Sequence, residues 1–308
     1  MPLSPNKVIF IVGPTAIGKT ALALKLARKI NGEIISCDSM QVYRGMNVGT
    51  SKPAKRLLNS ISHHLIDIIE PSEEFSVARF RVLAVKAIEE IISRRRMPLL
   101  VGGSGLYVKV LIDGIFEAPA TDREFRERLE QEAEEFGVGA LYRRLQETDK
   151  ESAGKIHAND LRRIIRALEV YEKAKAPISQ LRKNTAGLGD KYEVRIFGLN
   201  MERPALYGKI DERVELMFAE GLVNETRGLL EGKLSLTASQ ALGYKEVLGY
   251  LNGEYDLEEA KRLVKRNTRH FAKRQLTWFR RDKRVEWIML DEDFDTEETA
   301  RGLWKKLS

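Results

Sequence analysis

A chain of 308 residues is long enough for about two domains of ordinary size, and its single cysteine, Cys37, excludes an intrachain disulfide and a cysteine-rich zinc site. No apolar run approaches the roughly 18 residues of a membrane-spanning helix, and Met1 and Pro2 lead into a strand without a cleavable signal, so we expect a cytoplasmic protein with no membrane partner. A net charge of +7 alongside 45 acidic residues is typical of a folded protein that binds a polyanion.

The first predicted strand, 7–12, is followed by a glycine-bounded loop and then by an amphipathic helix over 21–30. The loop reads Gly13-Pro14-Thr15-Ala16-Ile17-Gly18-Lys19-Thr20 and matches the phosphate-loop pattern at every fixed position. Its backbone N–H groups and the helix start can surround a diphosphate, while the lysine supplies a cation and the threonine hydroxyl a ligand for Mg²⁺. The loop therefore predicts a diphosphate- or nucleotide-binding site with Thr20 as metal ligand; an ordinary glycine turn is the less favoured alternative.

The second predicted strand, 33–37, ends in Asp38 and Ser39, and the strand–helix–strand order predicts a parallel sheet. Ligands of such sheets bind beyond the carboxyl ends of the strands, so Asp38 is expected in the same crevice as the phosphate loop. A carboxylate beside a diphosphate is unfavourable unless it binds a metal or transfers a proton. A helix cap for the following segment is the alternative.

Further along, 63–69 is predicted as a third strand, 76–96 as a helix that covers the sheet, and 98–101 as a buried strand. His63 and His64 are adjacent, so they should point to opposite faces and serve structural roles instead of sharing a metal. The strand over 98–101 ends in Gly102-Gly103-Ser104-Gly105, where phosphoryl-transfer enzymes usually place a Mg²⁺-binding carboxylate. These glycines allow close approach of a flat substrate or a backbone, or simply a tight turn into a helix over 106–112.

From 114 to 191 strand patterns disappear, and charged helices are predicted over 123–136, 140–147 and 159–174. We interpret this segment as an all-helical lobe inserted between the core segments 1–113 and 192–308. Arg162 and Arg166 share one helical face, which fits a solvated surface and a phosphate contact about equally well. The overall expectation is an α/β fold, with a P-loop NTPase-like parallel sheet flanked by helices.

A strand over 192–199 returns to the core, and a helix beginning near Arg203 carries Arg213. This arginine could form a surface ion pair with Asp211 or in the neighbourhood of Glu220. The segment 257–284 is then predicted as one strongly basic and aromatic helix, with few compensating acids. Such a run of cations indicates contact with a nucleic-acid backbone, although part of the helix must also belong to the core.

Five blocks, in order along nearly the whole chain, resemble tRNA dimethylallyltransferases, the bacterial tRNA isopentenyltransferases of the IPP transferase family. The blocks are the phosphate loop, Asp38 to Met46, Gly49 to Pro53, Val101 to Tyr107 and Lys273 to Trp278. The resemblance implies transfer of a dimethylallyl group from dimethylallyl diphosphate to N6 of adenosine 37, next to the anticodon, in tRNAs that read codons beginning with U. It also implies release of pyrophosphate, Mg²⁺ as cofactor, and a helical lobe that holds the anticodon stem-loop. Nothing in the sequence suggests more than a monomer.

The resemblance assigns roles to individual residues. It implies that Asp38 is the general base, that Thr20 binds the metal and that Arg213 binds pyrophosphate. The residues it implies in tRNA contact are Asp38, Ser39, Met40, Gln41, Ser104, Arg126, Arg162, Arg163, Ile164, Ile165, Arg166, Gly243, Tyr244 and Lys245, with the last segment reaching Leu248. Two other functions fit the phosphate loop: an ATP-dependent kinase of a small molecule or nucleoside, and a non-catalytic RNA-binding module.

Overall fold

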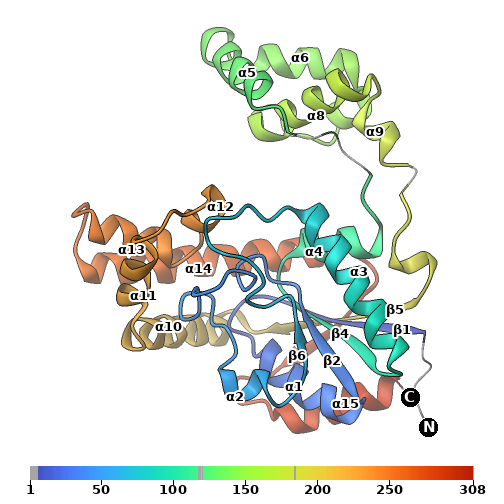
Figure 1. Cartoon of the computed structure of the whole chain (residues 1–308), viewed down its shortest axis with the longest axis vertical. Helices are drawn as coiled ribbons and strands as arrows, with labels where there is room; N and C mark the ends of the chain where they lie inside the picture. Colours follow the sequence, from blue (N-terminus) through green and yellow to red (C-terminus); the bar gives the residue numbers. More distant parts are fainter. Residues whose placement is uncertain (1–5, 117–118, 120, 184, 308) are drawn as a thin grey trace. The chain divides into compact units, whose positions relative to one another are not determined.

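The computed structural model describes residues 6–116, 119, 121–183 and 185–307 (Figure 1). The chain forms two compact units: a core unit, up to Ile112 and from Leu188 onward, and a helical unit, Asp113–Gly187. Leu188 packs in the apolar core of the core unit. The chain therefore returns to this unit before residue 192, the boundary that the strand pattern predicts. Met1 and Pro2, where we expect no cleavable signal, lie outside the described residues.

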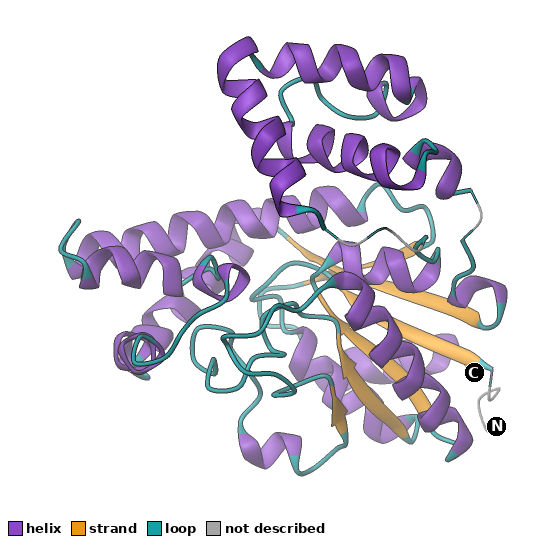
Figure 2. Ribbon diagram, turned by 45° about the horizontal axis from the view of Figure 1, so that its top comes forward, coloured by secondary structure: helices purple, strands orange, loops and turns teal. Residues whose placement is uncertain are grey.

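The core unit is built on a six-stranded sheet in the order β3-β2-β4-β1-β5-β6, in which every described pair of neighbouring strands is parallel (Figure 2). The strands are β1 Lys7–Val12, β2 Gly32–Ser36, β3 His63–His64, β4 Met97–Gly102, β5 Glu193–Met201 and β6 Val285–Leu290. Because all strands run the same way, the residues that follow β1, β2 and β4 meet at one edge of the sheet.

Both faces of the sheet are covered, as its continuous apolar strands require. Along β1 the side chains alternate: Phe10 and its even-numbered neighbours face the cluster with α3 (Val77–Ser93) and α4 (Gly105–Ile112). Ile9 and Ile11 face the other cluster, with α1 (Lys19–Lys29) and α15 (Thr296–Leu307). The remaining core helices are α2 Lys55–Leu58, α10 Arg203–Ala219, α11 Leu222–Leu229, α12 Leu236–Ser239, α13 Tyr244–Leu251 and α14 Leu257–Phe279, with a 3₁₀ turn at Leu188–Asp190.

Two predictions for the core unit were wrong in extent, and two elements were missed. The third strand ends at His64, because Leu65 and Asp67 have positive φ angles of 63° and 54°, which interrupt an extended chain. The basic helix ends at Phe279 and not at 284. The strand β6 and the helix α15 were not predicted.

The helical unit has its own apolar core. Its helices are α5 Arg123–Phe136, α6 Val138–Thr148, α7 Lys150–Ala153, α8 Leu161–Ala174 and α9 Ile178–Leu181. Asp122 and Asp160 cap α5 and α8 by accepting backbone N–H groups of their first turns. The segment 113–187 contains 14 lysines and arginines against 15 acidic residues, so the positive net charge of the chain belongs to the core unit. Among the described helices of both units, none is long and apolar enough to cross a membrane.

Candidate active site

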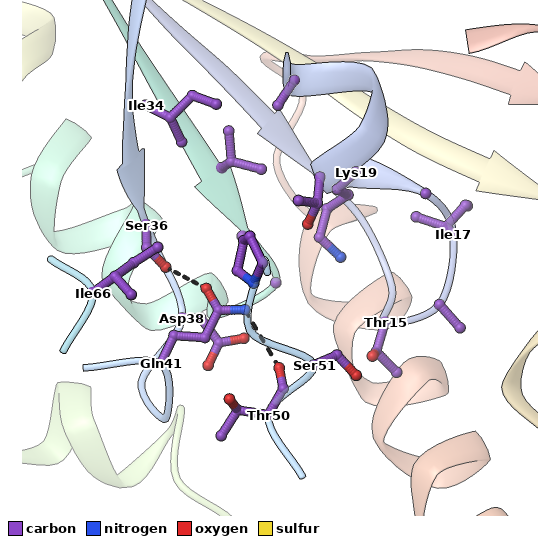
Figure 3. A pocket seen from close by; sticks show the side chains of 18 of the residues that line it. Thr15, Ile17, Lys19, Ile34, Ser36, Asp38, Gln41, Thr50, Ser51 and Ile66 are labelled. Atoms are coloured by element: carbon purple, nitrogen blue, oxygen red, sulfur yellow. Dashed lines mark hydrogen bonds between the residues drawn. The ribbon is translucent and has the colours of Figure 1, made fainter. Parts of the chain in front are cut away.

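The phosphate loop connects β1 to α1 and has a conformation that glycine permits at both ends. Gly13 has a φ of +143°, and a Cβ atom there would lie 2.7 Å from the carbonyl oxygen of Leu199. Gly18 has a φ of +91°, and a Cβ atom there would lie 2.9 Å from the ring of Phe294. These glycines fix the loop at the edge of the sheet. Residues 15–20 of the loop line a pocket in the core unit (Figure 3).

Lys19 extends into this pocket, and its ammonium group donates hydrogen bonds to the carbonyls of Gly13, at 3.0 Å, and Pro14, at 2.7 Å. The pKa of Lys19 is lowered from 10.5 to about 7, chiefly by burial and also by the neighbouring Arg213, while Asp38 acts in the opposite direction. The loop thus holds a cation that a bound dianion would stabilise strongly.

Arg213 faces the phosphate loop and is not a surface residue paired with Asp211. Its guanidinium donates to the hydroxyl of Thr15 at 3.1 Å, and burial lowers its pKa. Asp211 instead accepts hydrogen bonds from Arg269 of α14. The pocket therefore contains two basic side chains, Lys19 and Arg213.

Asp38 follows β2 and lines the same pocket, as the parallel sheet predicts. One carboxylate oxygen accepts the backbone N–H of Met40 at 2.8 Å, which closes a turn. The alternative role as a helix cap does not hold, because the next helix, α2, begins only at Lys55. The carboxylate is thus presented toward Lys19 across the pocket.

The loop after β2 is fixed by contacts that sequence reasoning missed. The carboxylate of Glu225, on α11, accepts the backbone N–H groups of Asn47, Val48 and Gly49 at 2.9 to 3.1 Å. It also accepts the hydroxyl of Tyr244 at 2.6 Å. Within the loop, Ser36 and Thr50 bind the side chain of Gln41, as drawn in Figure 3. Glu225 gives no signal in the sequence, because its three main-chain partners lie far away in the chain.

The glycines at the end of β4 and directly after it lie close to protein atoms, and Gly102 and Gly103 also line the pocket. A Cβ atom on Gly102 would lie 2.2 Å from the carbonyl oxygen of Cys37, and one on Gly103 would lie 1.9 Å from Nε2 of Gln275. Ser104, between them and Gly105, donates its backbone N–H to Cys37 at 3.3 Å. The prediction of close backbone approach is correct here.

His63 and His64 have separate partners. His64 Nε2 lies 2.7 Å from the buried carboxylate of Glu33. His63 Nδ1 lies 2.7 Å from the carbonyl oxygen of Ile61, so its Nε2 is a buried acceptor at the pocket wall, with no protein partner among the described residues, and burial lowers its pKa. The described residues contain no group of three or more histidine, cysteine or acidic side chains that could hold a metal ion.

Sequence comparison links this geometry to known proteins. The family model described as IPP transferase matches residues 41–282. A tRNA dimethylallyltransferase of Carboxydothermus hydrogenoformans is 51% identical over 285 residues, or 92% of both chains. One of Halothermothrix orenii is 49% identical over 289 residues, which cover 92% of this chain and 88% of its own. The chain belongs to the IPP transferase family.

Solved structures agree with this assignment. The tRNA isopentenylpyrophosphate transferase of Bacillus halodurans is 44% identical, with a TM-score of 0.72 over 98% of this chain and 97% of its own. A eukaryotic dimethylallyltransferase acting on tRNA is 30% identical, with a TM-score of 0.82 over 97% of this chain and 78% of its own. The P-loop NTPase-like fold class of the IPP transferases is thereby confirmed.

Not all residues that the resemblance to IPP transferases implies in tRNA contact are available on a surface. Tyr244 is 1% exposed and packs on Gly49, where a Cβ atom would lie 2.4 Å from its ring. Gly243 is buried as well, whereas Lys245 is exposed. Ser39 and Met40 are half-buried in the loop that carries Asp38.

In the helical unit of this IPP transferase, Arg126 and Arg166 both bind the fully buried carboxylate of Glu169. Ile164 and Ile165 lie in the apolar core of the unit, so their side chains cannot be the predicted contacts with RNA. The exposed cations of the segment 162–166 are Arg162 and Arg163. The amphipathic pattern of α8 explains why Arg162 and Arg163 are exposed while Ile164 and Ile165 are buried, since only one side of the helix faces the core.

The basic helix α14 is more neutral along its first half than its sequence indicates. Cations of that half pair with acidic residues of α10 and of its own first turn: Lys265 with Glu215, Arg269 with Asp211 and Arg262 with Glu259. Toward its end, Lys273 is exposed and has no acidic partner in the described part of the chain. Within α14, the exposed cations near its end are therefore less neutralised by acidic residues than those of its first half.

Proposed function

We propose that this protein transfers the dimethylallyl group of dimethylallyl diphosphate to N6 of adenosine 37 in tRNA and releases pyrophosphate. The supporting observation is the joint presence of Asp38, Lys19 and Arg213 in one pocket, opposite a strand β4 that ends in glycines. Two cations suit a diphosphate leaving group, and a carboxylate that follows the neighbouring strand suits removal of a proton from the attacking amine.

Departure of pyrophosphate increases negative charge at the phosphate loop. The loop N–H groups, the Lys19 ammonium and the Arg213 guanidinium would stabilise that charge more in the transition state than in the bound substrate. Because Arg213 also binds the hydroxyl of Thr15, its position is fixed before the substrate enters. Such preorganisation lowers the cost of reorganisation during the reaction.

The N6 amine of adenine is a weak nucleophile, because its lone pair is delocalised into the ring. In our proposal, Asp38 accepts the proton as nitrogen attacks the allylic carbon, and the bond from that carbon to the diphosphate oxygen breaks. The hydrogen bond from Met40 holds the carboxylate in place through one of its oxygens. The adenine must leave the RNA stack to reach it, which is less costly in an anticodon loop than in a duplex.

The donor set of the pocket fits Mg²⁺, which usually retains water and takes one or two protein ligands in addition to substrate phosphates. The hydroxyl of Thr20 would be the protein ligand, and the ion would supply further neutralisation of the leaving diphosphate. The lack of a larger carboxylate cluster among the described residues is compatible with such a site.

We further propose that tRNA contacts Arg162 and Arg163 of the helical unit and the exposed cations near the end of α14, such as Lys273. Arg126 and Arg166 would act chiefly by shaping α8, since Glu169 already occupies both guanidinium groups. Ser104 and the loop that carries Asp38 and Gln41 would contact the extruded nucleotide. The protein is proposed to act as a monomer on the anticodon stem-loop.

The decisive experiment is incubation with unmodified tRNA, Mg²⁺ and dimethylallyl diphosphate, followed by mass analysis of the nucleosides. We expect the dimethylallyl derivative of adenosine, mapped to position 37. A parallel incubation with labelled ATP tests the kinase alternative. Phosphoryl transfer to an acceptor, with no prenylated nucleoside, would replace our proposal with that one.

A further inference from the structure

One side chain of α14 connects two loops of the candidate active site. Gln275 is 7% exposed. Its Oε1 accepts the backbone N–H of Thr15 in the phosphate loop at 2.8 Å, and its Nε2 donates to the carbonyl of Gly103, after β4, at 3.1 Å. The side-chain amide of Gln275 therefore binds a backbone N–H group in the loop after β1 and a backbone carbonyl directly after β4.

The fit between Gln275 and these loops is close. A Cβ atom on Gly103 would lie 1.9 Å from Nε2, so glycine is needed for the amide to reach its partners. Thr15 is held at the same time from α10, because its hydroxyl accepts from Arg213. The geometry of Thr15, and with it the entrance to the phosphate loop, is thus set by two helices that lie outside the loop.

The helix that carries Gln275 also presents the cationic surface proposed for tRNA. Lys273 and Arg274 directly precede Gln275 and are exposed, whereas Gln275 itself faces the loops. One turn later Trp278 packs on Gly105, where a Cβ atom would lie 2.2 Å from its ring. Ser104, expected to contact the extruded nucleotide, lies between Gly103 and Gly105. Hence α14 touches both sides of the segment that receives the acceptor base.

We infer that Gln275 is a positioning residue that couples diphosphate binding to tRNA binding, an inference that rests on the proposed function. Binding of RNA to the exposed face of α14 restrains the helix, and the two hydrogen bonds of Gln275 carry that restraint to Thr15 and Gly103 together. Because linkage is reciprocal, a bound diphosphate strengthens tRNA binding by the same factor.

The test compares Gln275→Met, which keeps the length of the side chain but removes both hydrogen bonds, with the unaltered protein. Gly103→Ala displaces the Gln275 amide by placing a Cβ atom against its Nε2. This variant replaces Gln275→Met in the test if Gln275→Met does not fold. Gln146→Met, at an exposed position of α6, is the matched control. The affinity for inorganic pyrophosphate, which cannot react, is measured by calorimetry with and without saturating unmodified tRNA, and kcat and KM are measured with both substrates.

We expect tRNA to increase pyrophosphate affinity in the unaltered protein and in Gln146→Met. In Gln275→Met and Gly103→Ala this factor should fall about tenfold, within the range for substitutions in a coupling network, and kcat should fall more than KM rises. An unchanged coupling factor in Gln275→Met, or none in the unaltered protein, would overturn the inference. Failure of prenyl transfer by the unaltered protein would overturn the proposed function instead, while the pyrophosphate measurement still reports on the coupling.

Discussion

Affinity for dimethylallyl diphosphate should fall steeply above pH 7, because the phosphate loop holds a lysine that loses its proton easily. The pKa of Lys19 is lowered to about 7 by burial and by Arg213. The diphosphate favours the ammonium form, so binding should return the pKa toward its ordinary value of 10.5. A site that must take up one proton loses affinity about tenfold per pH unit above the pKa of the free protein, which gives about 50-fold between pH 7 and pH 9.

Calorimetry without tRNA, in two buffers of different ionisation enthalpy, measures both the affinity and the protons taken up. At pH 8.5 we expect uptake of about one proton per diphosphate bound. Nearby titratable groups should not interfere, since burial lowers the pKa of His63, which lines the pocket, and raises that of Tyr107 and Cys37. Lys19→Arg keeps its charge throughout this range and should give a flat profile. Constant affinity from pH 7 to pH 9 in the unaltered protein, without proton uptake, would refute the reasoning.

Three further variants test other parts of the protein. Asp38→Ala should lower kcat by about a thousandfold while tRNA affinity persists in a filter-binding assay; retained turnover would exclude this residue as the base. Glu225→Gln should reduce the free energy of unfolding in urea by about 1–3 kcal/mol, because a charged acceptor of three backbone N–H groups is lost, and an unchanged unfolding midpoint at equal slope would contradict this. Arg162→Ala combined with Arg163→Ala should weaken tRNA binding and lower its log–log salt slope by up to about 2, whereas a parallel salt dependence would remove these arginines from the interface.

The parts of the fold that could be predicted are those with strong local patterns. The strand β1, the phosphate loop and α1 follow from an apolar run, two glycines and an amphipathic period, and α5 begins and ends at the predicted residues. By contrast, β6 was missed because the cations at 280–284 continue the composition of α14. Its segment, Val285–Leu290, becomes a strand through pairing with β5.

The candidate site divides in the same way. Asp38 and the phosphate loop could be placed together from strand order alone, because parallel strands end at one edge. Gln275 and Glu225 could not, since each binds main-chain groups far away in sequence. The sequence also could not indicate that Arg126 and Arg166 share Glu169. A buried glutamate on α8 cannot be told from the exposed glutamates of nearby helices by residue type alone.

The two hydrogen bonds of Thr15 also determine when, during translation, the phosphate loop can reach its final conformation. Its partners Arg213 and Gln275 lie 198 and 260 residues further along the chain. At 5–20 residues per second, a ribosome needs roughly 13 to 50 s after making the phosphate loop to add the last of these partners. In a nascent chain, the phosphate loop would thus exist long before the side chains that hold Thr15 in place. We therefore expect the completed protein, and not a partly synthesised chain, to bind the diphosphate.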